Sequence, residues 1–464
     1  MQKPAYFPLA AALSAAFLSP LPVLAAPDTA APDTAAPNTA TLRDAALRDD
    51  VAWDIVEGLT TEIGPRLAAS PKEAQARDWA VARLKALGFA NVHIETYTMP
   101  AWVRGEEQAS VIAPFAQPLV ITALGNSGST GPQGLEAEIT YFPTLADLQA
   151  APAGSLKGKI AFVSHGMQAN QDGSGYGPFG QVRRIGPSIA AKKGAAGIVI
   201  RSVGTDHHRV PHTGFTIFEK GVAPIPAAAL SIPDAENLER MVKRGKPVRL
   251  HLLLTPKFVG ERESGNVIAD VPGSDPTAGI IVVAGHLDSW DLGTGAIDDA
   301  AGVAIVAAAA KRIMDAGQPR RTIRILWAGA EEVGGFGGEA YFAAHKQENH
   351  VLAMESDFGA DRVWRADYRL PEGARAVQSR IAAELAALGI VSSALPAGGG
   401  ADIEPLVKAG TSVIDLQQDG TRYFDLHHTA DDTLDKIDPA QLAQNVAAWT
   451  TVLSIAANAK ESLR

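Results

Sequence analysis

The sequence of 464 residues contains no cysteine. This absence excludes disulfide bridges, thiolate metal sites and a lipid anchor attached to a cysteine. Basic charge is also scarce, because 41 Lys and Arg stand against 51 Asp and Glu and give a formal net charge of −10. No long Lys/Arg run occurs, so the chain lacks the basic face of a nucleic-acid-binding protein and we expect no nucleic-acid partner.

The first 25 residues are typical of an export signal. Lys3 supplies a positive charge, an apolar stretch runs from about Phe7 to Leu24, and Ala25 and Ala26 supply the small residues of a cleavage site. The alternative is an uncleaved membrane anchor, but three prolines interrupt the stretch, which is short for a span of ~20 residues. We therefore expect residues 1–25 to be removed, leaving a periplasmic or extracellular protein without a stable membrane anchor.

A five-residue repeat, Ala-Pro-Asp-Thr-Ala with one Asn variant, follows the signal and ends at Ala40. Such a composition cannot form a core, so residues 26–40 are predicted to be a flexible spacer. Apolar residues at helical spacing then predict helices over 43–63 and 71–87, with Ser70 as the N-cap of the second.

Residues 111–255 have a different character, with short apolar strands such as 159–163 and 197–200 separated by Gly and Pro. We interpret this segment as an inserted β-rich domain that carries few residues of chemical importance. The main domain is then formed by residues 41–110 and 256–464.

Strands and helices alternate from Asn266 onward. The apolar pattern predicts strands at 279–285, 322–328, 350–356 and 411–416, and helices at 299–314, 336–347 and 439–457. This alternation predicts an α/β fold with a mostly parallel central sheet flanked by helices.

Histidine and acidic residues follow the predicted strands. They are His286 and Asp288 after the first strand, Asp298 before the next helix, Glu331 and Glu332 after the second strand, and Asp357 after the third. Ligands collect at the carboxyl ends of strands in open α/β sheets, so these side chains should converge on one crevice. Imidazole and carboxylate oxygen suit zinc, and the sequence therefore predicts a metal site there.

Individual residues in this group suit different tasks. Asp288 can accept the second imidazole N–H of His286 and fix its tautomer. A carboxylate can bridge two ions about 3.5–4 Å apart. Successive side chains diverge at a strand end, so one of Glu331 and Glu332 can hold metal while the other acts as general base.

Five ordered motifs resemble peptidase family M28. They are Gly285-His286-Leu287-Asp288, Gly295-Ala296-Ile297-Asp298-Asp299, Glu331-Glu332-Val333-Gly334, Glu355-Ser356-Asp357 and His428-Thr429-Ala430-Asp431-Asp432-Thr433. The run from Gly285 to Gly302 is most similar to the carboxypeptidase Q branch. Residues 63–67 and Pro211-His212-Thr213-Gly214 also resemble that branch, and Gly158-Lys159-Ile160 and residues 193–197 resemble a protease-associated domain.

The resemblance implies two zinc ions per chain and a role for each matched residue. His286 and Asp357 would bind one zinc, Glu332 and His428 the other, and Asp298 would bridge them. Glu331 would be the general base. The resemblance also implies short peptides as substrates. It is compatible with a homodimer, although no feature of the sequence indicates one.

Four further residues are candidates for contacts with the substrate. His427 stands where several family members have Tyr, and it either donates a hydrogen bond to the tetrahedral oxyanion or packs beneath the site. Tyr423 is a second candidate for that hydrogen bond. Asp402 and His212 are candidate substrate contacts, and the alternative for His212 is a solvated loop that includes two neighbouring histidines.

These observations favour an exopeptidase that hydrolyses short peptides, dipeptides foremost, with Glu331 activating a metal-bridging water. Aminopeptidase action on longer peptides is the alternative within the same class. A single-zinc glutaminyl cyclase and a non-catalytic binding protein on the same fold are alternatives from other classes. The bridging-type Asp298 favours two metals over one, and the retention of every ligand argues against a binding protein.

Overall fold

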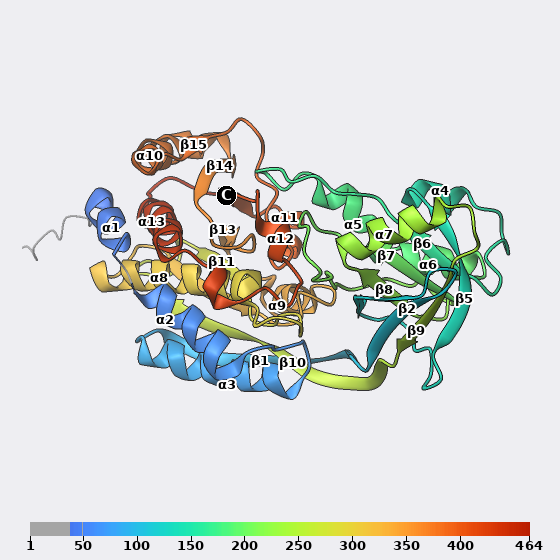
Figure 1. The fold of residues 1–464 in the computed structure, drawn as a ribbon. Coiled ribbons are helices and arrows are strands. Elements are labelled where there is room, and N and C mark those ends of the chain that lie inside the picture. Colours follow the sequence, from blue (N-terminus) through green and yellow to red (C-terminus); the bar gives the residue numbers. More distant parts are fainter. Residues whose placement is uncertain (1–37, 49) are drawn as a thin grey trace, which may run out of the picture. The chain divides into compact units, whose positions relative to one another are not determined.

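The computed structural model describes residues 38–48 and 50–464 (Figure 1). The predicted signal, residues 1–25, and residues 26–37 of the predicted spacer lie outside this part. Helix α1 (Thr39–Ala46) begins inside the predicted spacer, because the Asn38 side chain accepts a hydrogen bond from the Ala40 N–H and caps it. Within the described residues, no helix has both the length and the apolar character needed to cross a membrane.

One eight-stranded sheet has the order β1-β10-β12-β11-β13-β16-β14-β15. Its central strands β12, β11, β13 and β16 are parallel, whereas β1/β10, β10/β12 and β14/β16 pair antiparallel. The predicted α/β fold is confirmed, and the parallel strand pairs lie mainly at the centre of the sheet. The strands are β1 (Ala90–Val103), β10 (Lys257–Val271), β11 (Ile280–His286), β12 (Thr322–Ala328), β13 (His350–Glu355), β14 (Val363–Arg369), β15 (Val391–Ser392) and β16 (Ser412–Gln418).

Helices cover both faces of this sheet. On β11, Ile281 and Val283 belong to one apolar core and Val282 and Ala284 to another, because successive strand side chains point to opposite faces. The first core includes residues of α1, α2 (Val51–Gly58), α3 (Pro71–Ala86), α8 (Ala301–Ala316), α10 (Arg375–Leu385) and α13 (Pro439–Ala456), and the second includes residues of α9 (Phe336–His345) and α11 (Glu404–Lys408).

The first predicted helix is interrupted. The expected continuous helix over 43–63 was wrong, because α1 ends at Ala46 and α2 is followed directly by the π-helical turn η1 (Leu59–Ile63). Arg48 and Asp50, between α1 and α2, are exposed and bury nothing that would hold a continuous helix. Helix α3 begins as expected, with the Ser70 hydroxyl accepting the Glu73 N–H.

A second eight-stranded sheet has the order β3-β2-β9-β5-β6-β7-β8-β4. The chain enters it after β1 and returns through β10, and these two strands pair antiparallel from Ala90 opposite Asp270 to Val103 opposite Lys257 (Figure 1). Its strands are β2 (Glu107–Ala113), β3 (Gln117–Leu119), β4 (Ile121–Ala123), β5 (Leu135–Phe142), β6 (Ile160–Val163), β7 (Gly197–Arg201), β8 (Ala227–Leu230) and β9 (Arg249–Leu254).

The remaining helices are short. Four of them lie between β1 and β10, in the part of the chain that forms the second sheet, which we call the segment of the second sheet. They are α4 (Leu145–Ala150), α5 (Tyr176–Arg184), α6 (Gly186–Lys192) and α7 (Ile232–Val242). The others are α12 (Tyr423–Leu426) and the turns η2 (Ala296–Ala300), η3 (Glu372–Ala374), η4 (Ala386–Leu388) and η5 (Leu434–Lys436). Two of them, η2 and α12, lead into residues of the predicted site.

Candidate metal centre and substrate pocket

Parallel strand ends bring the predicted residues together. His286 is the last residue of β11 and pairs with Ala328 at the end of β12, just before Glu331 and Glu332. Asp357 follows the neighbouring strand β13, which ends at Glu355. The crevice expected from the strand pattern is therefore present at the carboxyl edge of the sheet.

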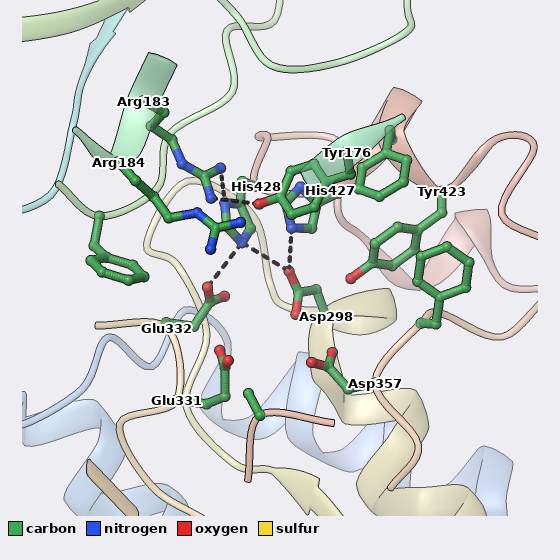
Figure 2. A pocket seen from close by; sticks show the side chains of 14 residues that line it. Tyr176, Arg183, Arg184, Asp298, Glu331, Glu332, Asp357, Tyr423, His427 and His428 are labelled. Atoms are coloured by element: carbon green, nitrogen blue, oxygen red, sulfur yellow. Dashed lines mark hydrogen bonds and ion pairs between the residues drawn. The ribbon is translucent and has the colours of Figure 1, made fainter. Parts of the chain in front are cut away.

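Asp298 lies at the centre of this group (Figure 2). Its Oδ1 is 3.0 Å from His286 Nε2, and that nitrogen is 3.5 Å from Asp357 Oδ1. Its Oδ2 is 3.2 Å from His428 Nε2, and that nitrogen is 2.9 Å from Glu332 Oε2. The two oxygens of one buried carboxylate thus face two separate clusters of ligand-type atoms.

The distances within each cluster fit a divalent cation. Ligand atoms ~2.1 Å from a tetrahedral zinc stand about 3.4 Å apart, which is close to the observed spacings. Asp298 Oδ2 and Asp357 Oδ1 are buried and receive no hydrogen bond from any donor of the described residues. Cations between these atoms would satisfy the two oxygens and the imidazole nitrogens that face them.

The pKa shifts of the site carboxylates also support cation binding here. Burial raises the pKa of Glu331, with further contributions from Asp357 and Asp288, to about 8. Burial and the neighbouring Asp298 raise the pKa of Glu332 well above its usual value. Asp298 is buried too, but the nearby imidazoles of His286 and His428 hold its pKa well below the usual range. So many carboxylates packed together are unfavourable without positive charge among them.

The second nitrogen of His286 contacts the predicted residue, Asp288, but through the main chain of that residue. Its Nδ1–H donates to the main-chain carbonyl of Asp288 at 2.9 Å, while the Asp288 Oδ1 lies 3.6 Å away. The Asp288 carboxylate instead accepts the Glu331 N–H at 3.1 Å. Asp288 therefore orients both His286 and Glu331, through two different groups.

Two residues that the sequence analysis did not single out hold the turn that carries Asp298. Asp432 Oδ1 accepts the N–H groups of Ala296 and Ile297, both at 2.7 Å. The Arg66 guanidinium is fully buried and donates to the carbonyls of Leu287, Thr294 and Gly295. Both residues lie in motifs that resemble the family, and this resemblance was the one feature of the sequence that could have indicated them.

A pocket of about 300 Å³ opens onto the site, and Glu331, Glu332, Asp298 and Asp357 line it. Aromatic residues Phe358, Tyr423 and Phe424 form part of its wall. The segment of the second sheet contributes Tyr176, Arg183, Arg184 and Phe215. These four residues were not foreseen, because the sequence analysis expected few residues of chemical importance in this segment and nothing in the sequence distinguishes Arg183 and Arg184 from ordinary basic residues at a helix end.

The predicted substrate contacts divide into two pairs. His427 and Tyr423 line the pocket; the His427 ring stacks on His428 at 3.5 Å, and its Nε2 lies 3.6 Å from Asp298 Oδ2. Asp402 and His212 are each 1 % exposed and do not line it. The structure therefore does not bear out a substrate contact for Asp402 or His212. The His212 ring is held inside by Asp206 and the main-chain carbonyl of His427, each at 2.7 Å.

Fold and pocket together define an α/β protein with a metallopeptidase type of site, and comparison with known proteins agrees. The sequence profile of peptidase family M28 matches residues 266–453. Carboxypeptidase Q from Bos taurus is 35 % identical over 408 residues, which cover 87 % of this chain and 85 % of that protein. The chain therefore belongs to peptidase family M28, and the predictions of this family and of an enzyme are confirmed.

Solved structures show the same relationship. A peptidase M28 precursor from Shewanella amazonensis SB2B matches with a TM-score of 0.90 and 48 % identity, over 92 % of this chain and 97 % of that chain. A zinc aminopeptidase from Bacillus subtilis matches with a TM-score of 0.65 and 19 % identity, over 89 % and 96 % of the two chains. At that identity the second likeness establishes the fold alone.

Proposed function

We propose that this protein is an exported, two-zinc exopeptidase that hydrolyses short peptides, dipeptides foremost. The observation that carries this proposal is the position of Asp298, whose two oxygens face separate clusters of ligand-type atoms. His286 and Asp357 would hold one zinc, Glu332 and His428 the other, and Asp298 would join both. This arrangement also favours two metals over the single zinc of a glutaminyl cyclase.

Zinc bound there would polarise the scissile carbonyl and favour ionisation of the attacking water. The chain supplies the proton transfers. Glu331 lines the pocket, and its carboxylate forms no hydrogen bond or ion pair with another described residue. Bound cations would offset the surrounding negative charge and lower the raised pKa of Glu331, so its carboxylate could take the proton from water and pass it to the leaving amine. Its main-chain N–H is fixed by Asp288, which holds the base in position.

His427 and Tyr423 would assist from the opposite wall. His427 is hemmed in by Tyr423, Phe424 and Tyr176, whose rings lie 5.1–5.4 Å from its own, and burial lowers its pKa well below the usual value. A neutral imidazole can donate one hydrogen bond, and we assign that bond to the developing oxyanion. The Tyr423 hydroxyl is the alternative donor.

The small pocket and the relatives support a short substrate. A volume of about 300 Å³ lies at the lower end of ligand sites and suits a peptide of very few residues. We also propose that residues 1–25 are an export signal and that residues 111–255 form an inserted protease-associated type of domain. The return of the chain through the paired strands β1 and β10 supports the insertion.

The change Glu331→Gln tests the proposed base. It keeps the size of the side chain, so zinc content should stay at the wild-type level while kcat falls by about 10²–10⁴-fold. The measurement is turnover of a panel of dipeptides, N-blocked dipeptides and longer peptides, with zinc determined on the same samples.

Glu339→Gln, an exposed change on α9, is the matched control and should leave turnover unchanged. Wild-type turnover in Glu331→Gln would contradict the assignment of the base. Cleavage of long peptides in preference to dipeptides would favour the aminopeptidase alternative.

A further inference from the structure

Arg184, the last residue of α5, is the one arginine of the pocket wall without a polar partner. Within residues 38–48 and 50–464 its guanidinium forms no hydrogen bond and no ion pair, and its Nε is buried without a partner. The guanidinium lies over the ring of Tyr176, whose centroid is 5.9 Å from Cζ. Figure 2 shows the guanidinium directed towards the space shared with Glu332 and His428.

The neighbouring residue Arg183, in contrast, has protein partners for its guanidinium. Arg183 is 3 % exposed and its guanidinium contacts the carbonyl of Thr213, the ring of His428 and the hydroxyl of Tyr176. These contacts occupy one guanidinium while the adjacent one stays open to the pocket. Both terminal nitrogens of Arg183 therefore have protein partners, whereas those of Arg184 are available to a ligand.

The charge of the pocket supports the same conclusion. Four carboxylates line it, and two divalent cations would neutralise them. The positive charges of Arg183 and Arg184 on the pocket wall would then remain, and of these two guanidiniums only that of Arg184 has no polar partner among the described residues. A planar guanidinium with a free edge matches a carboxylate, to which it can donate two parallel hydrogen bonds.

We infer that Arg184 binds the free terminal carboxylate of the peptide and so makes the enzyme select substrates cleaved one residue from the C-terminus. This inference rests on the proposed peptidase function. In a dipeptide the scissile carbonyl and the terminal carboxylate are one residue apart, about 3.5 Å along the chain. Both groups therefore fit in a single pocket that Glu331 and Arg184 line together. Phe215 and Tyr176 beside Arg184 offer apolar surface to the C-terminal side chain.

The test compares a dipeptide with the same dipeptide carrying a C-terminal amide. The wild-type enzyme should prefer the free acid, and Arg184→Gln should lower kcat/KM for the acid about 10–100-fold, mainly through KM. The amide should be cleaved by both proteins within about twofold, since it has no carboxylate for the guanidinium to bind. Arg184→Lys should recover part of the preference, because it keeps the charge without the planar fork.

Arg244→Gln is the matched control, since it removes an exposed arginine of the same segment that does not line this pocket. Equal losses for acid and amide in Arg184→Gln would overturn the inference, as would an unchanged preference. Calorimetric binding of both dipeptides to the Glu331→Gln protein, with and without Arg184→Gln, separates this inference from the proposed reaction. There the acid should bind more tightly than the amide only when Arg184 is present, whether or not the wild-type protein turns either compound over.

Discussion

Gly302 illustrates how closely the backbone packs around the site. A Cβ added there would lie 1.8 Å from the carbonyl oxygen of Ser356 and 2.2 Å from Asp299 Oδ1. Ser356 is the residue before Asp357, and Asp299 follows Asp298. Helix α8 can therefore approach the end of β13 only because position 302 has no side chain.

The change Gly302→Ala should lower the free energy of unfolding by about 2–3 kcal/mol, because the extra methyl overpacks a rigid contact. Denaturant unfolding measures this loss. Gly373→Ala is the matched control, since a Cβ there meets nothing within 4 Å, and it should leave stability unchanged or slightly raised. Equal stability of the two variants would show that the helix can shift to accommodate a side chain.

At the level of elements, loops from the segment of the second sheet hold the His427–His428 turn in place. The Thr213 N–H donates to the carbonyl of His428 at 3.0 Å, and His212 Nδ1 lies 2.7 Å from the carbonyl of His427. Asp206, on the other side of the His212 ring, is also buried. The position of His428 thus depends on residues more than 200 positions earlier in the chain.

The change His212→Ala should weaken zinc binding by about tenfold or more, as the loss of groups that orient metal ligands commonly does. Zinc retained during dialysis against a competing chelator measures this effect. His207→Ala removes an exposed histidine of the same loop and should retain zinc like the wild type. Unchanged zinc affinity in His212→Ala would mean that the turn keeps its conformation without this contact.

The elements that the sequence predicts best are those whose apolar runs are bounded by clear turns. Strand β12 runs from Thr322 to Ala328 and helix α9 begins at Phe336, both as expected, because apolar runs ending in Gly-rich turns define them. The paired strands β1 and β10 were not foreseen. Residues 257–263 of β10 are polar or partly exposed, so no apolar pattern distinguishes that half of the strand from a loop.

The same limit applies to the site. The strand-end pattern was sufficient to expect His286, Glu332 and Asp357 in one crevice, because parallel strands end at the same edge. The contribution of Arg184 depends on how a distant segment folds against that edge, and local sequence holds no information on that contact. For the same reason the burial of His212 could not be foreseen.

At the scale of the whole molecule, two sheets supply one pocket, and the chain passes from the first sheet to the second after β1 and returns through β10. The first sheet contributes the acidic and histidine side chains at its carboxyl edge, and the segment of the second contributes cationic and aromatic side chains. The carboxylates at the edge of the first sheet repel one another when no cation is bound. Metal binding should therefore raise the stability of the folded protein as well as support its chemistry.

Stepwise addition of zinc to metal-free protein, with dipeptide hydrolysis and the melting temperature followed, would test whether Asp298 joins two zinc ions. Both should rise until two zinc ions are bound per chain and then level off. An Asp298→Asn sample should fail to reach that plateau, because one bridging oxygen is replaced by a poor ligand. Full hydrolysis at one zinc per chain, or in the metal-free protein, would contradict the two-metal centre.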